Sequence, residues 1–273
     1  MTSNAESWTV GKVALVTGAG SGIGAALARE LVRRGAGAVV VTDIDHDAAL
    51  DVAHGLSGAA ETVVSVQALD VGDRSAIEDV VRMIEQEHGR LDLVCSNAGI
   101  GTGGDVDAPV GVWQRSWDVN VMAHVHAAQA ALPGMLARGS GEFLHTCSAA
   151  GLLTVAGDAP YAVTKHAAVA FAEWLSLTYG DRGITVTALC PLGVETSMLA
   201  ANDLLATRFV RETGRILSAE EVAASALDAL AAGEVLALPH AEVAAMEHAR
   251  TTDRRAWLAR LRAAVDALPE HGS

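Results

Sequence analysis

The sequence predicts an α/β protein in which about seven parallel strands form a doubly wound sheet covered by helices on both faces. Short, almost continuously apolar runs rich in β-branched residues alternate with longer segments of helical periodicity. Of the 273 residues, 51% are hydrophobic and 19% are charged, which suffices for a large core and argues against disorder. No linker rich in Pro, Gly or Ser and no short repeat divides the chain. Successive strand–helix–strand units therefore join one sheet through right-handed crossovers.

The predicted strands and helices follow one another with little interruption. The strands are residues 13–17, 38–43, 63–69, 91–96, 142–148, 184–190 and, more weakly, 235–238. The helices are residues 22–34, 45–55, 73–88, 109–137, 159–180, 219–232 and 241–268. Ligands of such sheets bind beyond the carboxyl ends of the strands, where the winding direction reverses. We therefore expect functional residues at those strand ends.

The chain is expected to form one domain with additions at both ends. Residues 1–10 form a polar tail, residues 11–240 the single nucleotide-binding and catalytic domain, and residues 241–273 a helical extension. The tail lacks the apolar core of a signal peptide, and no run of eighteen apolar residues predicts a membrane span. The formal charge of -14 disfavours binding to nucleic acid or to an anionic membrane.

Three cysteines indicate the cellular compartment. Cys95, Cys147 and Cys190 lie far apart, each at or beside the end of an apolar run. This pattern is typical of reduced, buried thiols in a cytoplasmic protein and not of a disulfide framework or a zinc site. No metal site is predicted.

A tyrosine and a lysine four residues apart form the most informative pair of side chains. The chain has only two tyrosines and two lysines, against seventeen arginines, and Tyr161 and Lys165 are one of each. On a helix these positions share one face, so the phenol and the ammonium can reach one site. A neighbouring cation favours the phenolate and would lower the phenol pKa from its usual value of about 10. From these two residues alone, a half-buried tyrosine beside a solvated lysine is an equal alternative.

A glycine-rich turn follows the first predicted strand and opens the first predicted helix. Its sequence is Thr17-Gly18-Ala19-Gly20-Ser21-Gly22-Ile23-Gly24. Small residues let the backbone approach a pyrophosphate, and the helix N-terminus offers free N–H groups to it. Because the turn lies in the first strand–helix–strand unit, it predicts a dinucleotide site. The expected contacts there are Gly18, Ser21, Gly22, Ile23 and Gly24.

Carboxylates end the next two strands. Asp43 can accept both ribose hydroxyls of an adenosine and would repel a 2′-phosphate. No Arg or Lys lies between Arg34 and Arg74 to pair with such a phosphate, so we expect NAD(H) to be preferred over NADP(H). Asp70 and Val71 are candidates for contact with the adenine, although a helix-capping role for Asp70 is an equal alternative.

Taken together, these motifs resemble the short-chain dehydrogenases/reductases (SDRs), in their compact single-domain branch. The resemblance covers residues from about 11 to 200. It rests on the glycine loop, Asn97-Ala98-Gly99, Asn120, Ser148 and Tyr161-x3-Lys165, in this order. It implies a Rossmann-like fold, a nicotinamide cofactor and the interconversion of a secondary alcohol and a ketone by hydride transfer.

The resemblance also implies a role for each polar side chain. Tyr161 would be the general acid/base that exchanges a proton with the substrate oxygen, and Lys165 would lower the pKa of Tyr161 and bind the nicotinamide ribose. Ser148 would stabilise the charge on the reacting oxygen. Asn120 would bind a water that continues a proton path from Lys165. The implied cofactor contacts beyond the first three strands are Asn97, Ala98, Gly99, Tyr161, Lys165, Pro191, Val194 and Thr196.

One position departs from the family pattern. Where the family continues Pro-Gly after the sixth strand, this chain has Pro191-Leu192. If that glycine has a positive φ, then Leu192 is strained or the turn is different. A place in the wall of the substrate pocket is the other interpretation of Leu192.

The resemblance places a lid over the substrate at about residues 195–217. Apolar residues of this segment would close over a hydrophobic small-molecule substrate or, as an equal alternative, pack against the protein itself. The expected substrate contacts are Gly101, Leu152, Leu192, Met198 and Leu199.

The same resemblance implies self-association. The long Ala-rich helices 109–137 and 159–180 would pair with copies of themselves in a homodimer or homotetramer. The final helix, 241–268, would pack on its own domain or on a neighbouring subunit. Two other functions stay open: a non-catalytic NAD-sensing or scaffold protein on this fold, and a related NAD enzyme such as an epimerase, dehydratase or enoyl reductase.

Overall fold

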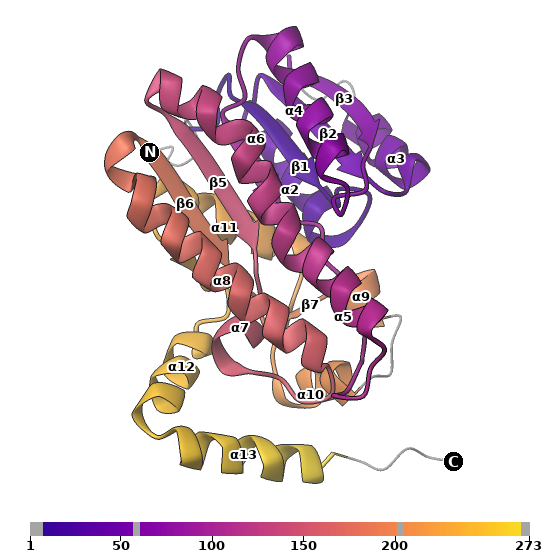
Figure 1. Cartoon of the computed structure of the whole chain (residues 1–273), viewed down its shortest axis with the longest axis vertical. Helices are drawn as coiled ribbons and strands as arrows, with labels where there is room; N and C mark the ends of the chain where they lie inside the picture. Colours follow the sequence, from indigo (N-terminus) through magenta and orange to yellow (C-terminus); the bar gives the residue numbers. More distant parts are fainter. Residues whose placement is uncertain (1–7, 57–60, 201–204, 269–273) are drawn as a thin grey trace.

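A central parallel sheet organises the protein. The structure is a computed structural model, and it describes residues 8–56, 61–200 and 205–268. The strand order is β3-β2-β1-β4-β5-β6-β9, and every neighbouring pair is parallel. The predicted doubly wound, seven-stranded α/β fold is therefore confirmed (Figure 1). The strands are β1 (Val13–Thr17), β2 (Ala38–Asp43), β3 (Val63–Ala68), β4 (Leu93–Ser96), β5 (Gly141–Thr146), β6 (Ile184–Leu189) and β9 (Leu236–Ala237).

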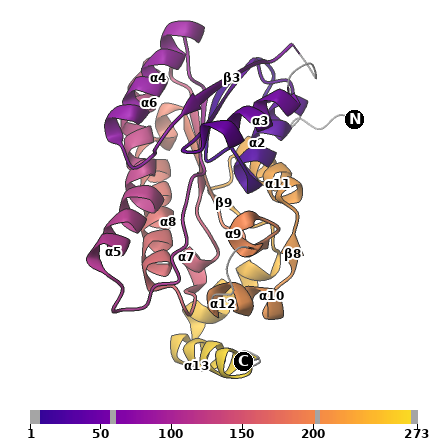
Figure 2. The ribbon, with the colours of Figure 1, turned by 90° about the vertical axis from the view of Figure 1, so that its right-hand side faces the viewer.

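Helices cover both faces of this sheet, as Figure 2 shows from the side. One face carries α4 (Arg74–His88), α6 (Ala123–Arg138) and α8 (Ala159–Tyr179). The other carries α2 (Gly22–Arg33), α3 (His46–Leu56) and α11 (Ala219–Ala231). Strand β1 lies between β2 and β4, so the winding direction reverses beside β1. The carboxyl end of β1 is therefore the expected ligand position.

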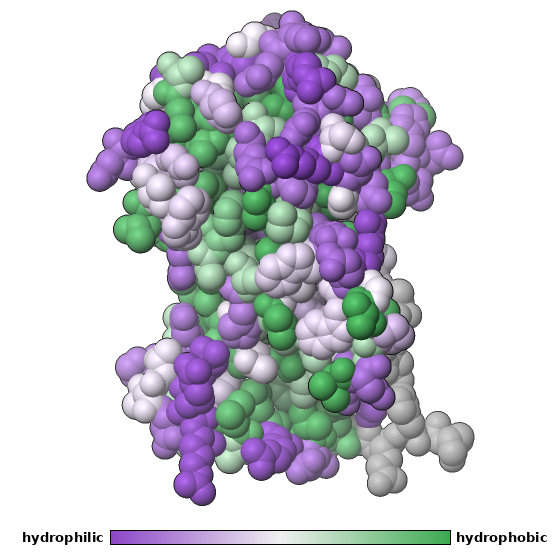
Figure 3. Space-filling view, viewed as in Figure 1, coloured by the Kyte–Doolittle hydropathy of each residue, from purple (hydrophilic) through white to green (hydrophobic). Residues whose placement is uncertain are grey.

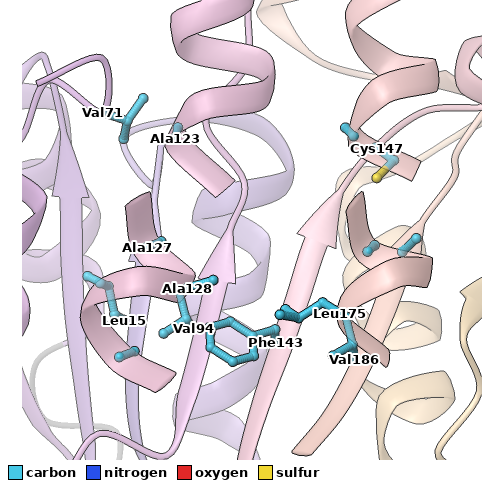
Figure 4. Packing of buried hydrophobic residues seen from close by; sticks show 14 of the residues in the cluster. Leu15, Val71, Val94, Ala123, Ala127, Ala128, Phe143, Cys147, Leu175 and Val186 are labelled. Carbon is cyan, nitrogen blue, oxygen red and sulfur yellow. The ribbon is translucent and has the colours of Figure 1, made fainter. Parts of the chain in front are cut away.

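The core on the α6 and α8 side explains why the strands are continuously apolar. In Figure 4, Leu15, Val94, Phe143 and Val186 lie across neighbouring strands, and Leu175 of α8 lies beside them. Phe143 and Leu15 are completely buried. Alanines such as Ala127 and Ala128 let α6 approach the sheet closely. Because a parallel strand covered on both faces has no solvent side, its sequence shows no alternation of apolar and polar residues.

The predicted helix 109–137 contains a local change of helical geometry. It consists of α5 (Val110–Trp117), a π-helical turn η1 (Asp118–Met122) and α6. Such a π-turn inserts one residue into an otherwise α-helical rod and is frequent at functional sites. Asn120 lies in the middle of this turn.

The predicted single helix 241–268 is wrong, because the structure has two helices there. They are α12 (Glu242–Thr252) and α13 (Arg254–Asp266), and Asp253 between them has φ -141° and ψ 88°. The Asp253 carboxylate accepts the Ala256 N–H at 2.9 Å and so caps the new helix. In Figure 1 α13 crosses below the rest of the domain.

The predicted lid is a folded segment with its own small sheet. Strands β7 (Gly193–Val194) and β8 (Ile216–Leu217) pair in parallel, and α9 (Ser197–Ala200) and α10 (Leu205–Thr213) lie between them in the sequence. Parts of three predicted segments lie outside the described residues: 201–204 of the lid, 1–7 of the tail and 269–273 of the extension. Besides α9 and α10, two short helices were not predicted: α7 (Ala150–Leu153) and the 3-10 turn η2 (Gly180–Arg182).

The three cysteines are buried and unpaired. Within the described ranges, no helix is both long and apolar enough to cross a membrane. In the same part of the chain, no group of three or more His, Cys, Asp or Glu side chains is arranged to hold a metal ion.

Candidate active site

A single cavity of about 550 Å³ lies at the carboxyl edge of the sheet and contains most of the predicted site residues. It extends from the glycine loop to the lid and to α13. Gly24, Asn120 and Leu152 are the three predicted residues that do not line it. Those that do are Gly18, Ser21, Gly22, Ile23, Asp43, Asp70, Val71, Asn97, Ala98, Gly99, Gly101, Ser148, Tyr161, Lys165, Pro191, Leu192, Val194, Thr196, Met198 and Leu199.

The glycines of the first loop have two different physical roles. Gly18 and Gly22 have φ values of +62° and +52°, a backbone region that other residues rarely adopt. Gly24 is required by space, because a Cβ there would lie 2.2 Å from the Gly18 carbonyl oxygen and 2.5 Å from Asn97 Nδ2. At the start of α2, the Ser21 side chain makes no capping hydrogen bond. The first N–H groups of α2 have no intrahelical partner and suit an anion at this edge.

Asp43 lies beside this loop with its carboxylate held in place. One carboxylate oxygen accepts the Gly20 N–H at 2.9 Å, and the other accepts the Asp45 N–H at 3.0 Å. Asp43 lines the cavity next to Ser21 and Gly22. The backbone N–H groups of Gly20, in the glycine loop, and of Asp45 therefore orient the carboxylate.

Arg115 was not foreseen at the same end of the cavity. It extends from α5, lines the cavity and donates a hydrogen bond from Nη2 to Asp70 Oδ1 at 3.0 Å. Burial alone would raise the pKa of Asp70, but the bonds from Arg115 and from the Gly72 N–H outweigh it, and the pKa is lowered. The sequence offered no signal, because α5 lies 45 residues from Asp70. A cation is thus present here, already paired with a carboxylate.

Asn97 joins the carboxyl ends of three strands. Its Nδ2 donates to the Thr17 and Gly18 carbonyls at 3.0 and 3.2 Å, and its Oδ1 accepts the Thr146 hydroxyl at 3.0 Å. The N–H groups of Asn97 and Ala98 both donate to Thr17 Oγ1. β1, β4 and β5 are therefore fixed to one another where the cavity opens.

Ser148 and Tyr161 meet across the middle of the cavity. Ser148 follows β5, and its hydroxyl accepts the Ala150 N–H at 3.1 Å and lies close enough to the phenol of Tyr161 to favour the ionised form of that phenol. Burial raises the pKa of Tyr161 to about 12, and the nearby Ser148 hydroxyl offsets only part of this rise. The phenol is thus in its proton-donating form at neutral pH.

The predicted lowering of the Tyr161 pKa by Lys165 is not present in this structure. Lys165 Nζ lies 5.6 Å from the centre of the Tyr161 ring and donates to the Thr146 carbonyl at 2.9 Å. The ammonium is turned to the end of β5, and desolvation of the phenol dominates. Burial lowers the pKa of Lys165 as well. Gly99 leaves room for the ammonium, since a Cβ there would lie 3.2 Å from Nζ.

Asn120 is fully buried behind this cluster, and its side chain is bonded to protein groups. Oδ1 accepts the Ile100 N–H at 2.8 Å, while Nδ2 donates to the Ile100 carbonyl at 2.9 Å and to Thr164 Oγ1 at 3.1 Å. The side chain therefore fixes the segment after β4 to α8. The predicted water-binding role of Asn120 stays a prediction.

Asp158 is a second residue that the sequence interpretation missed. It is the N-cap of α8, where its carboxylate accepts the Tyr161 N–H, and it also accepts the N–H groups of Thr102 and Gly103 and the Thr102 hydroxyl. Asp158 thereby fixes the start of the helix that carries Tyr161 and Lys165 to the segment after β4. An Asp two residues before a proline in a first helical turn is a capping signal that could have identified it.

The turn after β6 shows whether Leu192 is strained by a positive φ or lines the cavity. Among the described residues, Thr154 is the only one other than glycine with a positive φ, so Leu192 is not strained in this way. Its side chain lines the cavity, which agrees with the second interpretation. The turn is held by His240, a residue that was also missed. His240 is buried, and it accepts the Leu192 N–H on Nδ1 at 3.2 Å.

Four of the five residues predicted to contact the substrate line the cavity, and their role stays a prediction. Gly101, Leu192, Met198 and Leu199 line this cavity, but Leu152 is 5% exposed and packs in the core. Its neighbour Leu153 lines the cavity instead. α7 is a single helical turn, so no periodicity in the sequence could indicate which of its two leucines lines the cavity.

This site defines a class of protein: an oxidoreductase on a Rossmann-like fold, with a glycine-rich dinucleotide loop and a Ser–Tyr–Lys cluster at one sheet edge. The family model described as short chain dehydrogenase matches residues 12–204. The chain belongs to the short-chain dehydrogenase/reductase family.

Named relatives and solved structures agree with this assignment. The chain is 38% identical over 192 residues to 1-deoxy-11-beta-hydroxypentalenate dehydrogenase of Streptomyces exfoliatus, covering 69% of each chain. It is 36% identical over 195 residues to epidermal retinol dehydrogenase 2 of Mus musculus, covering 69% of this chain and 62% of the relative.

A short chain dehydrogenase/reductase from Burkholderia phymatum in complex with NAD superposes with a TM-score of 0.82 at 28% identity, covering 91% of this chain and 95% of the other. L-sorbose reductase from Gluconobacter frateurii, complexed with NADPH and L-sorbose, has a TM-score of 0.76 at 26% identity, covering 85% and 96%.

Proposed function

We propose that the protein is an NAD(H)-dependent alcohol dehydrogenase/ketone reductase acting on a hydrophobic secondary alcohol or ketone. The observation that carries this proposal is that the Ser148 hydroxyl and the Tyr161 phenol interact in the cavity that also contains the glycine loop and Lys165. A proton donor, a second hydroxyl and a dinucleotide-binding edge are the groups that carbonyl reduction requires.

The residues present fit a nicotinamide dinucleotide. The positive φ of Gly18 and Gly22, the uncapped start of α2 and the carboxylate of Asp43 provide a pyrophosphate cradle and a ribose acceptor along one cavity. Asp70, Val71, Asn97, Ala98 and Gly99 continue the same wall towards Lys165. Pro191, Val194 and Thr196 line it from the side of the lid. When bound, the nicotinamide would supply or accept the hydride.

The chain's own residues would manage the proton and the charge. The high pKa of Tyr161 keeps the phenol protonated at neutral pH, ready to donate to the oxygen of a ketone. The Ser148 hydroxyl would donate a hydrogen bond to the same oxygen and stabilise its developing charge. Lys165, freed from the Thr146 carbonyl, would bind ribose hydroxyls. Asp158 caps α8, the helix that carries Tyr161 and Lys165.

The experiment is to follow NADH absorbance with a panel of secondary alcohols and ketones. Tyr161→Phe should lower turnover by about 10²–10⁴-fold, because general acid/base catalysis typically contributes this much. Tyr179→Phe is the matched control, since Tyr179 is the other tyrosine of α8 and does not line the cavity. Retained turnover in Tyr161→Phe would refute the mechanism. NADH binding without turnover of any alcohol or ketone by the wild type would favour a scaffold or sensor.

Preference for NAD over NADP is supported by Asp43. Its carboxylate is fixed beside the glycine loop, where it would repel a 2′-phosphate, and the nearby Arg115 is paired with Asp70. Asp43→Ala should reduce the ratio of kcat/KM for NAD to that for NADP by about tenfold, a change of about 1.4 kcal/mol. An unchanged ratio would remove this support.

A homo-oligomer is supported by the surface of α5 and α8. Val110 is 82% exposed on α5, and Trp174 and Leu177 are 53% and 85% exposed on α8. Figure 3 shows apolar surface across the face that these helices form. A homodimer or homotetramer would cover it. Leu177→Glu should reduce the mass measured by light scattering to that of a smaller species, and an unchanged mass would argue against this surface.

The cytoplasmic location, like the exclusion of nucleic acid, stays a prediction. It is supported by the three buried, unpaired cysteines.

A further inference from the structure

The C-terminal helices contribute a wall to the cavity that contains Ser148 and Tyr161. Met246 of α12 and Trp257, Leu261 and Ala264 of α13 line it. They lie outside residues 12–204, which match the family model. Figure 3, in the orientation of Figure 1, shows apolar surface in the recess above α13. This wall is therefore built by the two C-terminal helices, beyond the residues that the family model matches.

Only the apolar face of α13 is turned to the cavity. Trp257 is 8% exposed and Leu261 is half-buried, whereas Leu258 is 43% exposed. The four arginines of the helix are all exposed: Arg254, Arg255, Arg260 and Arg262. Among the described residues, no charged side chain of α7, α9, α10, α12 or α13 lines the cavity. A carboxylate would find no cationic partner on these helices.

One hydrogen bond attaches α13 to the wall next to Ser148. Trp257 Nε1 donates to the Leu153 carbonyl at 3.1 Å, which satisfies the only polar atom of the indole. The next residue, Thr154, has φ 69° and ψ 153°, a conformation that persists only where the surroundings impose it. Both Leu153 and Thr154 line the cavity. α13 is thus docked on the segment that follows the catalytic serine.

We propose that Trp257, Leu261 and Met246 form a distal subsite that binds an apolar chain or ring system extending from the reacting carbon of the substrate. This rests on the proposed function, because that function places the reacting carbon at Ser148 and Tyr161. The substrate is then a neutral alcohol or ketone with a long or bulky apolar part.

The test compares Leu261→Ser with Leu258→Ser, the same change on the inner and outer faces of one helix. 2-Butanol and 2-decanol are oxidised with NAD by the wild type and both variants. Leu261→Ser should lower kcat/KM for 2-decanol by tenfold or more and leave 2-butanol within about twofold, because the loss of apolar contacts discriminates on this scale. Leu258→Ser should leave both within about twofold. Equal losses for both alcohols, or no loss for 2-decanol, would overturn the proposal.

A binding measurement separates this proposal from the proposed function. Calorimetric titration of 2-decanone into protein with NAD does not depend on turnover, since an oxidised cofactor and a ketone do not react. Weaker binding in Leu261→Ser alone, with no alcohol oxidised by any form, would support the subsite and refute the function. Unchanged binding in Leu261→Ser, with normal oxidation of 2-butanol, would support the proposed function and refute the subsite.

A second, independent observation concerns His240, which lies between β9 and α12. Its Nδ1 accepts the Leu192 N–H at 3.2 Å, and its Nε2 lies 3.0 Å from the Gly193 carbonyl and 3.1 Å from the Arg215 carbonyl. One N–H donor and two carbonyl acceptors are satisfied together only by the tautomer that accepts on Nδ1 and carries its proton on Nε2. A single buried side chain thus holds the turn after β6 and the end of the lid.

The packing between these two segments leaves no spare room. A Cβ at Gly193 would lie 2.4 Å from Ile216 Cδ1 and 2.9 Å from Val210 Cγ1. A Cβ at Gly214 would lie 3.1 Å from Leu192 Cδ2. We infer that His240 is a positioning residue, which fixes residues 191–196 against the cofactor now that Leu192 stands where the family has glycine.

The test uses two variants that each keep half of the contacts. His240→Asn keeps an acceptor for the Leu192 N–H, and His240→Gln keeps a donor for the two carbonyls. Both should raise the Kd for NADH, measured by fluorescence titration, by about tenfold, because each leaves a buried polar group unpaired. His248→Asn, on the exposed surface of α12, is the control and should change nothing. A lower Tm with an NADH Kd within twofold of wild type in both variants would overturn the inference.

Discussion

Gly24 offers a sharp test of how the glycine loop is built. In Gly24→Ala the new methyl would lie 2.2 Å from the Gly18 carbonyl oxygen, more than 1 Å inside an ordinary contact of roughly 3.5 Å. It would also lie 2.5 Å from Asn97 Nδ2. Both neighbours belong to the network that fixes β1 to β4, so neither can move alone.

The expected cost follows from these contacts. Forced overpacking costs about 1–3 kcal/mol. Displacing Asn97 would break its bonds to the Thr17 and Gly18 carbonyls, at about 1 kcal/mol each. We therefore expect Gly24→Ala to lower the free energy of unfolding by roughly 3–5 kcal/mol, a large part of the ~5–15 kcal/mol available to a typical protein. NADH binding should weaken with it.

Gly111→Ala is the matched control. Gly111 lies in the first turn of α5, and a Cβ there would meet nothing within 4 Å. The same substitution should therefore raise the free energy of unfolding by up to ~1 kcal/mol, because alanine is the better helix former. Urea unfolding and NADH fluorescence titration measure both variants. If Gly24→Ala unfolds within ~0.5 kcal/mol of the wild type, the close-packing argument is refuted.

Three further substitutions test other parts of the site and core. Ser148→Ala should lower kcat by about 100-fold with an unchanged Kd for NADH, and a parallel loss of binding would contradict a role confined to the reacting oxygen. Thr154→Gly should raise the free energy of unfolding by ~1 kcal/mol, because relief of a positive φ of 69° exceeds the entropy cost of glycine; a decrease would show that the turn is not strained. His145 is completely buried without a hydrogen-bond partner, and burial lowers its pKa to about 3. The unfolded chain takes up the proton first as pH falls below about 6.5, so stability present at pH 7 is lost towards pH 3. His145→Phe should reduce this loss by about 2 kcal/mol at pH 5, and urea midpoints that fall equally in both proteins would refute it.

The sequence predicted well those features that local patterns specify. All seven strands of the central sheet were found, because buried parallel strands are short apolar runs with polar residues at their ends. The glycine loop, Ser148 and the Tyr161–Lys165 pair came together in one cavity because each follows or faces the carboxyl end of a strand. The order of these motifs along the chain was enough to place them at the carboxyl edge of the sheet.

What the sequence did not predict depends on contacts between distant segments. The restart of the helix after Asp253 leaves the helical periodicity on both sides almost unchanged, so the break was invisible. The i, i+4 spacing placed Lys165 near Tyr161, but not the Thr146 carbonyl that takes up its ammonium. Arg115 and His240 reach the site from segments 45 and 48 residues away from their partners.

The origin of the cavity walls has a consequence for how such a chain can diversify. Ser148, Tyr161 and the glycine loop come from the family-matched part, whereas α12 and α13 follow β9 at the end of the chain, beyond that part. Recombination or insertion in this last piece can reshape one end of the cavity without altering a bond of the reacting groups. We therefore expect related chains with diverged tails to differ in the size of molecule they accept while sharing one chemistry, and grafted tails offer a direct route to new ranges of substrates.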